Sequence, residues 1–208
     1  KVTVCEDTST GIYNAMNQGS RLAKGNHLLF LNSGDSFYDN FVLENLKKYS
    51  LSKKISYFFI CKVLAKNNSW NIPINEEKIF SADAVPVHQA ILFNKFFYKK
   101  NLFNKQYHIA ADYEYKLKLL KGNNIKFIPY ILSNHVLGGV SSTYKFQNYI
   151  KISKELFLID YAYKSFFVLL KNQINLLIKF ILYQTGLNAV TEFILSKIYE
   201  NKAYEIKI

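Results

Sequence analysis

Polar residues that could bind a metal ion follow a short apolar run in the stretch "LLFLNSGD", where Asn32 and Asp35 come after Leu28 to Leu31. The run is too short for a core helix and is bounded by turn residues, which is typical of a strand buried on both faces of a parallel sheet. Ligands of open α/β sheets bind beyond the carboxyl ends of the strands. A site is therefore expected at this turn.

The carboxylate of Asp35 is a hard oxygen ligand of the kind that Mg²⁺ or Mn²⁺ takes together with a diphosphate. Because Mg²⁺ keeps several waters, one carboxylate plus substrate phosphates can suffice. The alternative is an Asx-turn in which Asn32 or Asp35 only satisfies nearby backbone groups. Taken alone, the tetrapeptide "NSGD" favours this structural alternative.

The elements around the turn are expected to alternate between strands and helices. Residues 2–5 predict a strand, and 11–25 a helix capped by Ser9 or Thr10 and ended by Gly25; with the next strand they form a right-handed βαβ unit. The inward face of this helix is expected to be Ile12, Ala15, Met16, Gly19, Leu22 and Ala23. Further strands are expected within 54–65, 88–103 and 125–132, with helices at 39–49, within 88–103 and at 110–122, and a long loop with room for a short hairpin at 66–87.

Composition limits the classes of protein and partner. The 208 residues, half of them apolar, can form one domain or one domain with an appended segment. A net charge of +12 favours anionic partners or an anionic membrane surface. The lysines are scattered and form no Arg-rich patch, so nucleic-acid binding is not expected. Two cysteines, Cys5 and Cys61, favour a reducing compartment and leave one disulfide open.

The residues from 145 onward have helical periodicity. Within 166–182, the polar residues Lys171, Asn172, Asn175 and Lys179 form one narrow face of an otherwise apolar helix. Two lysines in its middle argue against a membrane-spanning helix. Two interpretations remain: an interfacial helix whose lysines reach anionic head groups, or a helix packed on the sheet domain or on a partner subunit.

The stretch "GIYNAMNQGSRLAKGNHLLFLNSGD" resembles the bacterial family 2 glycosyltransferases of GT-A fold that build surface polysaccharides. The matching positions are Gly11, Ile12, Tyr13, Ala15, Met16, Asn17, Gly19, Leu31, Asn32, Ser33, Gly34 and Asp35. Later stretches, "HQAILFNK", "AADYEYKLKLLKG" and "GGVSS", are similar to later blocks of the family and occur in the same order. The resemblance covers residues 2–142.

This resemblance implies an α/β fold of GT-A (Rossmann-like) type, a mostly parallel sheet flanked by helices, over residues 1–144, followed by a helical tail over 145–208. The implied activity is inverting transfer of a sugar from a nucleotide-diphosphate sugar to a saccharide or lipid-linked acceptor. The polymers concerned are cell-surface polysaccharides, namely O-antigen lipopolysaccharide, capsule or exopolysaccharide.

The resemblance also implies roles for individual residues. Asp35 would hold Mn²⁺ or Mg²⁺ on the diphosphate, with His135 as a further diphosphate or metal contact, and Asp112 would be the catalytic base. Substrate-binding positions are Asp7, Gly11, Asn14, Asn17, Asn32, His88 and Gln89. Each has a structural alternative: an acid in the first turn of a helix is favoured by the helix dipole, a lone histidine is often structural, and Asn14 and Asn17 could form a solvated face. Ser9 and Asn14 stand where relatives often have acids, which affects the donor expected.

The resemblance finally predicts that the chain starts inside a longer protein whose first strand and helix would cradle the nucleotide base. On that expectation, the 208 residues alone bind the donor weakly. The expected location is cytoplasmic, peripheral on the inner face of the cytoplasmic membrane. Two alternatives stay open: a non-catalytic remnant that docks through its C-terminal helices, and a basic, aromatic-rich module that binds anionic polymer.

Overall fold

The computed structural model describes residues 4, 6, 11–64, 69–71, 87–122, 124–137, 145–187, 189–190 and 193. Its elements, in chain order, are α1 (Ile12–Leu22), β1 (His27–Leu28), β2 (Ser36–Phe37), α2 (Val42–Lys47), β3 (Ser56–Leu64), β4 (Ser69–Asn71), the 3₁₀ turn η2 (His88–Ala90), β5 (Ile91–Asn94), α3 (Lys95–Lys100), α4 (Ala111–Lys121), β6 (Ile125–Val136), α5 (Phe146–Tyr163) and α6 (Phe166–Gln184). The expected strand at 2–5, Asp7, the caps at 9 and 10, and the "GGVSS" block lie outside the described residues, as does most of the loop 66–87.

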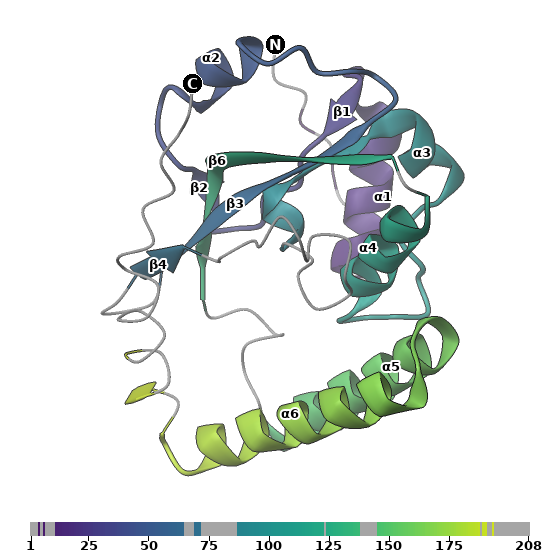
Figure 1. Cartoon of the computed structure of the whole chain (residues 1–208), viewed down its shortest axis with the longest axis vertical. Coiled ribbons are helices and arrows are strands. Elements are labelled where there is room, and N and C mark those ends of the chain that lie inside the picture. Colours follow the sequence, from purple (N-terminus) through teal and green to yellow (C-terminus); the bar gives the residue numbers. More distant parts are fainter. Residues whose placement is uncertain are drawn as a thin grey trace.

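The α/β class is confirmed, with a curled sheet flanked by helices (Figure 1). The strand order is β1-β5-β3-β6-β2, and β4 pairs with β3. The expectation of a mostly parallel sheet is wrong for the described strands, because β3 and β6 form the one parallel pair and the other pairings are antiparallel. Two strands that follow each other in the chain pair in parallel only through a crossover connection, usually a helix. Residues 29–35, which link β1 to β2, contain no helix and so provide no such connection.

The long strand β6 bends beside β3. The register moves from Phe58↔Phe127 to Ile60↔Ile131, so β6 carries extra residues at Pro129, and a second shift follows. Proline has no backbone N–H to give to the ladder and is tolerated at such bulges. A bulged strand bends, and Figure 1 shows a sharp bend in β6; its last residues lie beside β2 and the turn before it.

The sheet has an apolar core on each face. Phe58 belongs to the cluster that α1, α3 and α4 cover, whereas Tyr57 and Phe59 belong to the cluster that α2 covers. The same alternation continues in the run after β1, where Leu28 and Phe30 contact the first cluster and Leu29 the second. The run is thus covered on both faces as predicted, but its ladder is only two residues long.

Helix α1 confirms the predicted helix, but the predicted inward face is only partly right: Met16 is buried as expected, and other expected residues are not. The buried residues are Tyr13, Met16, Asn17 and Ser20, while Ile12 and Leu22 are exposed. The inward polar groups are satisfied inside the protein: Asn17 Nδ2 donates to the Phe103 carbonyl at 3.0 Å, and Ser20 Oγ donates to the Asn17 carbonyl at 2.7 Å. These internal hydrogen bonds offset the free energy that it would cost to bury the amide and hydroxyl groups without partners.

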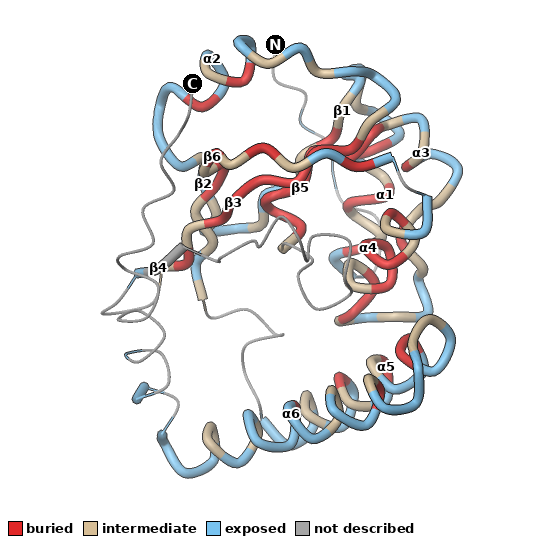
Figure 2. Tube along the Cα trace, viewed as in Figure 1, coloured by how far each residue is buried: buried red, intermediate tan, exposed pale blue. Residues whose placement is uncertain are grey.

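Helix α5 begins at Phe146 and packs against the sheet domain. Ile159 of α5 packs with Ala110 and Leu117 at the start and middle of α4. Helix α6 lies along α5 and is mostly exposed, as the pale tube in Figure 2 shows. By length and composition α6 could cross a membrane.

Candidate active site

The turn that follows the extended run holds the carboxylate of Asp35 in place. The Asp35 N–H donates to the Asn32 carbonyl at 3.0 Å, and the Asn32 N–H donates back to Asp35 Oδ2 at 3.0 Å. Gly34 has φ +90°, a conformation that costs glycine little and other residues more. Asp35 thus bonds to a local backbone group, as the structural alternative expected, but its carboxylate also contacts the more distant residues described next.

Asp35 accepts hydrogen bonds from three further groups. Gln89 Nε2 donates to Oδ2 at 2.8 Å, and Oδ1 receives His135 Nδ1 at 3.0 Å and the Val136 N–H at 3.2 Å. Burial alone would raise the pKa of this carboxyl, but Gln89, His135 and the two backbone donors outweigh it, and the pKa lies below its usual value. Asp35 is therefore ionised at neutral pH.

Asp112 lies in the first turn of α4, and three side chains contact its carboxylate. Tyr13 donates to Oδ1 at 3.0 Å, His88 Nδ1 lies 3.1 Å from Oδ2, and Lys116 Nζ lies 3.6 Å from Oδ2. Burial raises the pKa of Asp112, but Lys116, His88 and Tyr13 together hold it well below the usual range. This carboxyl is also ionised at neutral pH.

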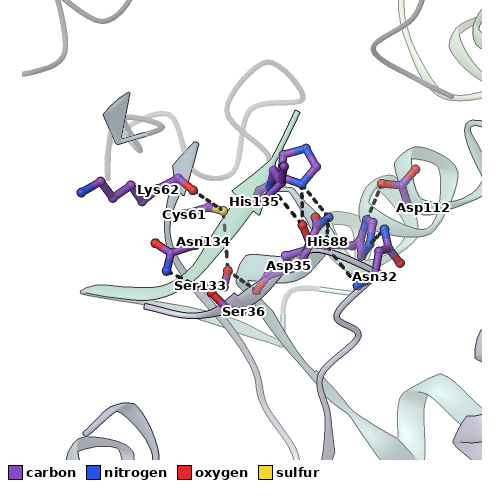
Figure 3. A network of polar contacts seen from close by, with 12 residues as sticks. Asn32, Asp35, Ser36, Cys61, Lys62, His88, Asp112, Ser133, Asn134 and His135 are labelled. Carbon is purple, nitrogen blue, oxygen red and sulfur yellow. Dashed lines mark hydrogen bonds and ion pairs between the residues drawn. The ribbon is translucent and has the colours of Figure 1, made fainter. Parts of the chain in front are cut away.

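His88 joins the two carboxylate centres (Figure 3). Its Nδ1 faces Asp112, and its Nε2 lies 3.2 Å from Asn32 Nδ2. Both contacts are satisfied by a neutral imidazole that carries its proton on Nδ1, donates to Asp112 and accepts from Asn32. Asn32 in turn donates its backbone N–H to Asp35. Asp35, Asn32, His88 and Asp112 therefore form one continuous polar network.

Several predicted site residues come together in this network, and others do not. It unites Asn32, Asp35, His88, Gln89, Asp112 and His135. Asn17 lies in the core instead, where its Oδ1 accepts from the Tyr98 hydroxyl and the Phe103 N–H, so the expected substrate contact is replaced by a packing role. Gly11, at φ +91°, is the exposed residue before α1, and Asn14 is half-buried on that helix.

Three supporting residues were missed in the sequence. Lys116 stands four residues after Asp112, a helical ion-pair spacing that could have revealed it. The Tyr13 hydroxyl also lies 2.6 Å from the Ile109 carbonyl oxygen, and no local pattern points to that contact. Glu155 is distant in sequence, and its partners are backbone groups.

Glu155 of α5 clamps the turn before Asp112. Its Oε1 accepts the His108 N–H at 2.8 Å, and its Oε2 accepts the N–H groups of Ile109 and Ala110, both at 2.9 Å. Glu155 is buried. A buried carboxylate is stable when backbone donors surround it, and here these donors belong to the segment that leads into the catalytic candidate.

A cavity of about 480 Å³ opens at Asp112, between the start of α4 and the α5–α6 hairpin; we call it the α4–α6 pocket. Its walls include Ile152 and Leu156 of α5 and the polar stripe of α6, which consists of Lys171, Asn172, Asn175 and Lys179. The stripe therefore faces α4 and α5 across the pocket. The lysines that were expected to reach lipid head groups line the pocket, and the exposed outer face of α6 is apolar.

A divalent ion would meet a limited ligand set here. In the part of the chain that the structure describes, no three or more His, Cys, Asp or Glu side chains are grouped to hold a metal. Asp35 and His135 supply one carboxylate and one imidazole. The four donors on Asp35 occupy the four acceptor directions of a carboxylate, so an ion bound there would have to take the place of one donor.

The comparisons place the chain near glycosyltransferases, although no family model matches it. It is 24% identical over 162 residues to a PGL/p-HBAD biosynthesis glycosyltransferase of Mycobacterium bovis, and to the protein of the same name from Mycobacterium tuberculosis. These matches cover 73% of this chain and 61% of each relative, so the chain spans less than two thirds of the relatives' length. The similarity supports a glycosyltransferase.

A solved structure was also matched: S. aureus TarS 1-349 in complex with UDP, with a TM-score of 0.41 and 14% sequence identity. The match covers 67% of this chain and 43% of that chain.

The Glu155 clamp predicts that Glu155→Gln destabilises the chain by about 1–3 kcal/mol, because a glutamine can accept fewer of the three N–H bonds and leaves buried donors unsatisfied. Urea unfolding followed by circular dichroism measures this. The matched control is Glu44→Gln, which removes an equal charge from an exposed position on α2. Equal, small effects of the two substitutions would show that the clamp contributes nothing.

The lowered pKa values of Asp35 and Asp112 predict acid lability. Their stabilising contribution is complete above the ordinary value of 3.8 and is lost as pH falls through the lower folded-state pKa values. The melting temperature of the parent chain should therefore fall steeply below about pH 4, and the fall should be shallower in Asp112→Asn. Parallel pH profiles for the parent and Asp112→Asn would contradict the assignment of a lowered pKa to Asp112.

Proposed function

We propose that this chain is the catalytic part of a family 2, GT-A type glycosyltransferase that transfers a sugar from a nucleotide-diphosphate sugar to an acceptor hydroxyl in cell-surface polysaccharide synthesis. The observation that carries the proposal is the network that joins Asp35 to Asp112 through Asn32 and His88. Three segments that are far apart in the sequence contribute to it. Packing alone does not require two ionised carboxylates to converge in this way.

In the proposed reaction, Asp112 accepts the proton of the acceptor hydroxyl while that oxygen attacks the anomeric carbon. A new carbon–oxygen bond forms, the bond from the anomeric carbon to the phosphate oxygen breaks, and its electron pair leaves with the nucleoside diphosphate. Attack opposite to the leaving group inverts the anomeric centre. The low pKa of Asp112 keeps it ionised before the reaction, and the hydroxyl becomes acidic enough to transfer its proton only as the new bond forms.

Asp35 and His135 would hold Mn²⁺ or Mg²⁺ together with the diphosphate. A bound ion supplies Lewis-acid stabilisation of the charge on the leaving diphosphate. The chain's own contribution is to keep Asp35 ionised and oriented, through Gln89 and the Asn32–Asp35 turn. Ser133 supports Gln89, because its hydroxyl donates to the Gln89 carbonyl at 2.7 Å.

We also propose that the protein is cytoplasmic and peripheral on the inner face of the cytoplasmic membrane. The supporting feature is the outer face of the α5–α6 hairpin, where Phe166, Phe167 and Tyr161 are at least 71% exposed. Such a face can enter the boundary between head groups and acyl chains. This surface also favours the docking remnant as the second candidate, since docking would not use either carboxylate.

Asp112→Asn tests the choice between enzyme and docking remnant. The substitution removes the proton acceptor, so transfer should fall by about 10²–10⁴-fold. The assay measures nucleoside diphosphate release from UDP- and GDP-linked sugars with Mn²⁺, and circular dichroism confirms the fold. Asp39→Asn, an exposed aspartate near α2, is the control and should keep full activity. Undiminished turnover in Asp112→Asn would exclude the proposed base.

A further inference from the structure

The side-chain amide of Gln89 lies between Asp35 and His135. Its nitrogen Nε2 is 2.8 Å from Asp35 Oδ2 and 3.0 Å from His135 Nδ1. The nitrogen must be the amide atom that faces Asp35, because an amide oxygen at this distance would be repelled by the ionised carboxylate. Gln89 and the side chain of Asp35 are each only 2% exposed. One buried donor therefore stands within hydrogen-bond distance of both groups.

The three groups at this point cannot all be satisfied at once. His135 Nδ1 lies 3.0 Å from an acceptor, Asp35 Oδ1, and 3.0 Å from a donor, Gln89 Nε2. A ring nitrogen carries either a proton or a lone pair. With a proton it donates to Asp35 and faces the donor nitrogen of Gln89; with a lone pair it accepts from Gln89 and faces a carboxylate oxygen. One of the two contacts is therefore unfavourable in either tautomer.

A divalent cation in place of the amide would remove this conflict. Such a cation takes lone pairs from a carboxylate oxygen and from a neutral imidazole nitrogen, so Asp35 and His135 could both bind it while the ring proton lies on Nε2. The backbone donors to Asp35 cannot leave as easily, since the N–H groups of Asn32 and Val136 belong to the turn and to the end of β6. Among the donors on Asp35, only the Gln89 side chain is neither backbone nor a proposed ligand.

We propose that the Gln89 amide occupies the cation position between Asp35 and His135 and is the donor that a divalent cation displaces. The inference rests on the proposed function, because that proposal assigns Asp35 and His135 to the cation. When the cation binds, the Gln89 side chain rotates away while Ser133 Oγ still donates to the Gln89 carbonyl. Gln89 thereby lowers the affinity for the cation, since binding must break a hydrogen bond to a charged group.

Titration of the full 208-residue chain with Mn²⁺, followed by the EPR signal of free Mn²⁺, tests the inference without any sugar donor. Gln89→Leu removes the competing amide at similar side-chain volume and should tighten Mn²⁺ binding by about three- to tenfold. Adding Asp35→Asn to this variant should remove the gain, because the carboxylate ligand is lost. Gln106→Leu, the same substitution at an exposed position, is the control and should bind Mn²⁺ as the parent chain does.

NMR of the parent chain provides a second measurement that does not depend on the folding of Gln89→Leu. Addition of Mg²⁺ should move the side-chain amide signals of Gln89 and speed their exchange with water, because the amide leaves its buried partners. The amide signals of Gln106 should not change. Gln89 signals that do not respond to Mg²⁺ would overturn the inference.

The Mn²⁺ titration separates this inference from the proposed function. Binding that is unchanged or weaker in Gln89→Leu would show that Gln89 only orients Asp35, and would overturn the inference while the proposed transfer stands. Tighter binding in Gln89→Leu, with a parent chain that never releases nucleoside diphosphate, would refute the proposed function and not the inference. Mn²⁺ that binds neither chain would overturn the inference and the metal role together, and would leave the proposed base to the Asp112→Asn test.

Discussion

Two ionised carboxylates, the buried side chain of Asp35 and the half-buried side chain of Asp112, constrain this structure more than any other feature. A carboxylate removed from water is tolerated only when hydrogen-bond donors and cations surround it. Asp35 obtains its donors from its own turn, from η2 and from the end of β6, while Asp112 obtains them from α1, η2 and its own helix. The positions of α1, η2 and β6 relative to one another are therefore tied to the need to satisfy both groups.

The bend of β6 and the Glu155 clamp each help to position one of the two carboxylate centres. The bend acts on the donors to Asp35, and the clamp acts on the helix that carries Asp112. The bulge at Pro129 redirects β6, whose last residues include His135 and Val136, donors to Asp35. The clamp fixes the segment before α4, and so the start of the helix that carries Asp112. Helix α5 is thus a structural support of the site as well as one wall of the pocket.

Much of the architecture could be predicted from local pattern. The apolar run within 54–65 gave β3, and the helical period with Gly122 at its end gave α4. The inward face of α1 could not be predicted in full, because Asn17 is buried through bonds to Tyr98 and Phe103, which no local window contains. The antiparallel direction of most strand pairs was missed for a similar reason. Whether two strands can pair in parallel depends on a crossover connection between them, and the sequence does not show which connections are crossovers.

The site itself was predicted through resemblance more than through spacing. Asp35, His88, Gln89, Asp112 and His135 were named from separate stretches, and nothing in those stretches says that they meet. Glu155 lies 47 positions from His108 and binds only backbone, so its role needs the three-dimensional structure. The polar stripe of α6 was recognised correctly, but its direction depends on how the hairpin packs.

The central claim is that the network joining Asp35 to Asp112 is where a metal-bound nucleoside diphosphate would sit. NMR of the histidine rings tests this directly, because Mn²⁺ broadens nearby signals and the chain has four histidines. With Mn²⁺ and UDP or GDP, the account predicts strong broadening of His135 and then His88, and little change at His27, whose ring contacts the Ile55 carbonyl beside β3. Equal broadening of all four rings, or the strongest effect at His27, would contradict it.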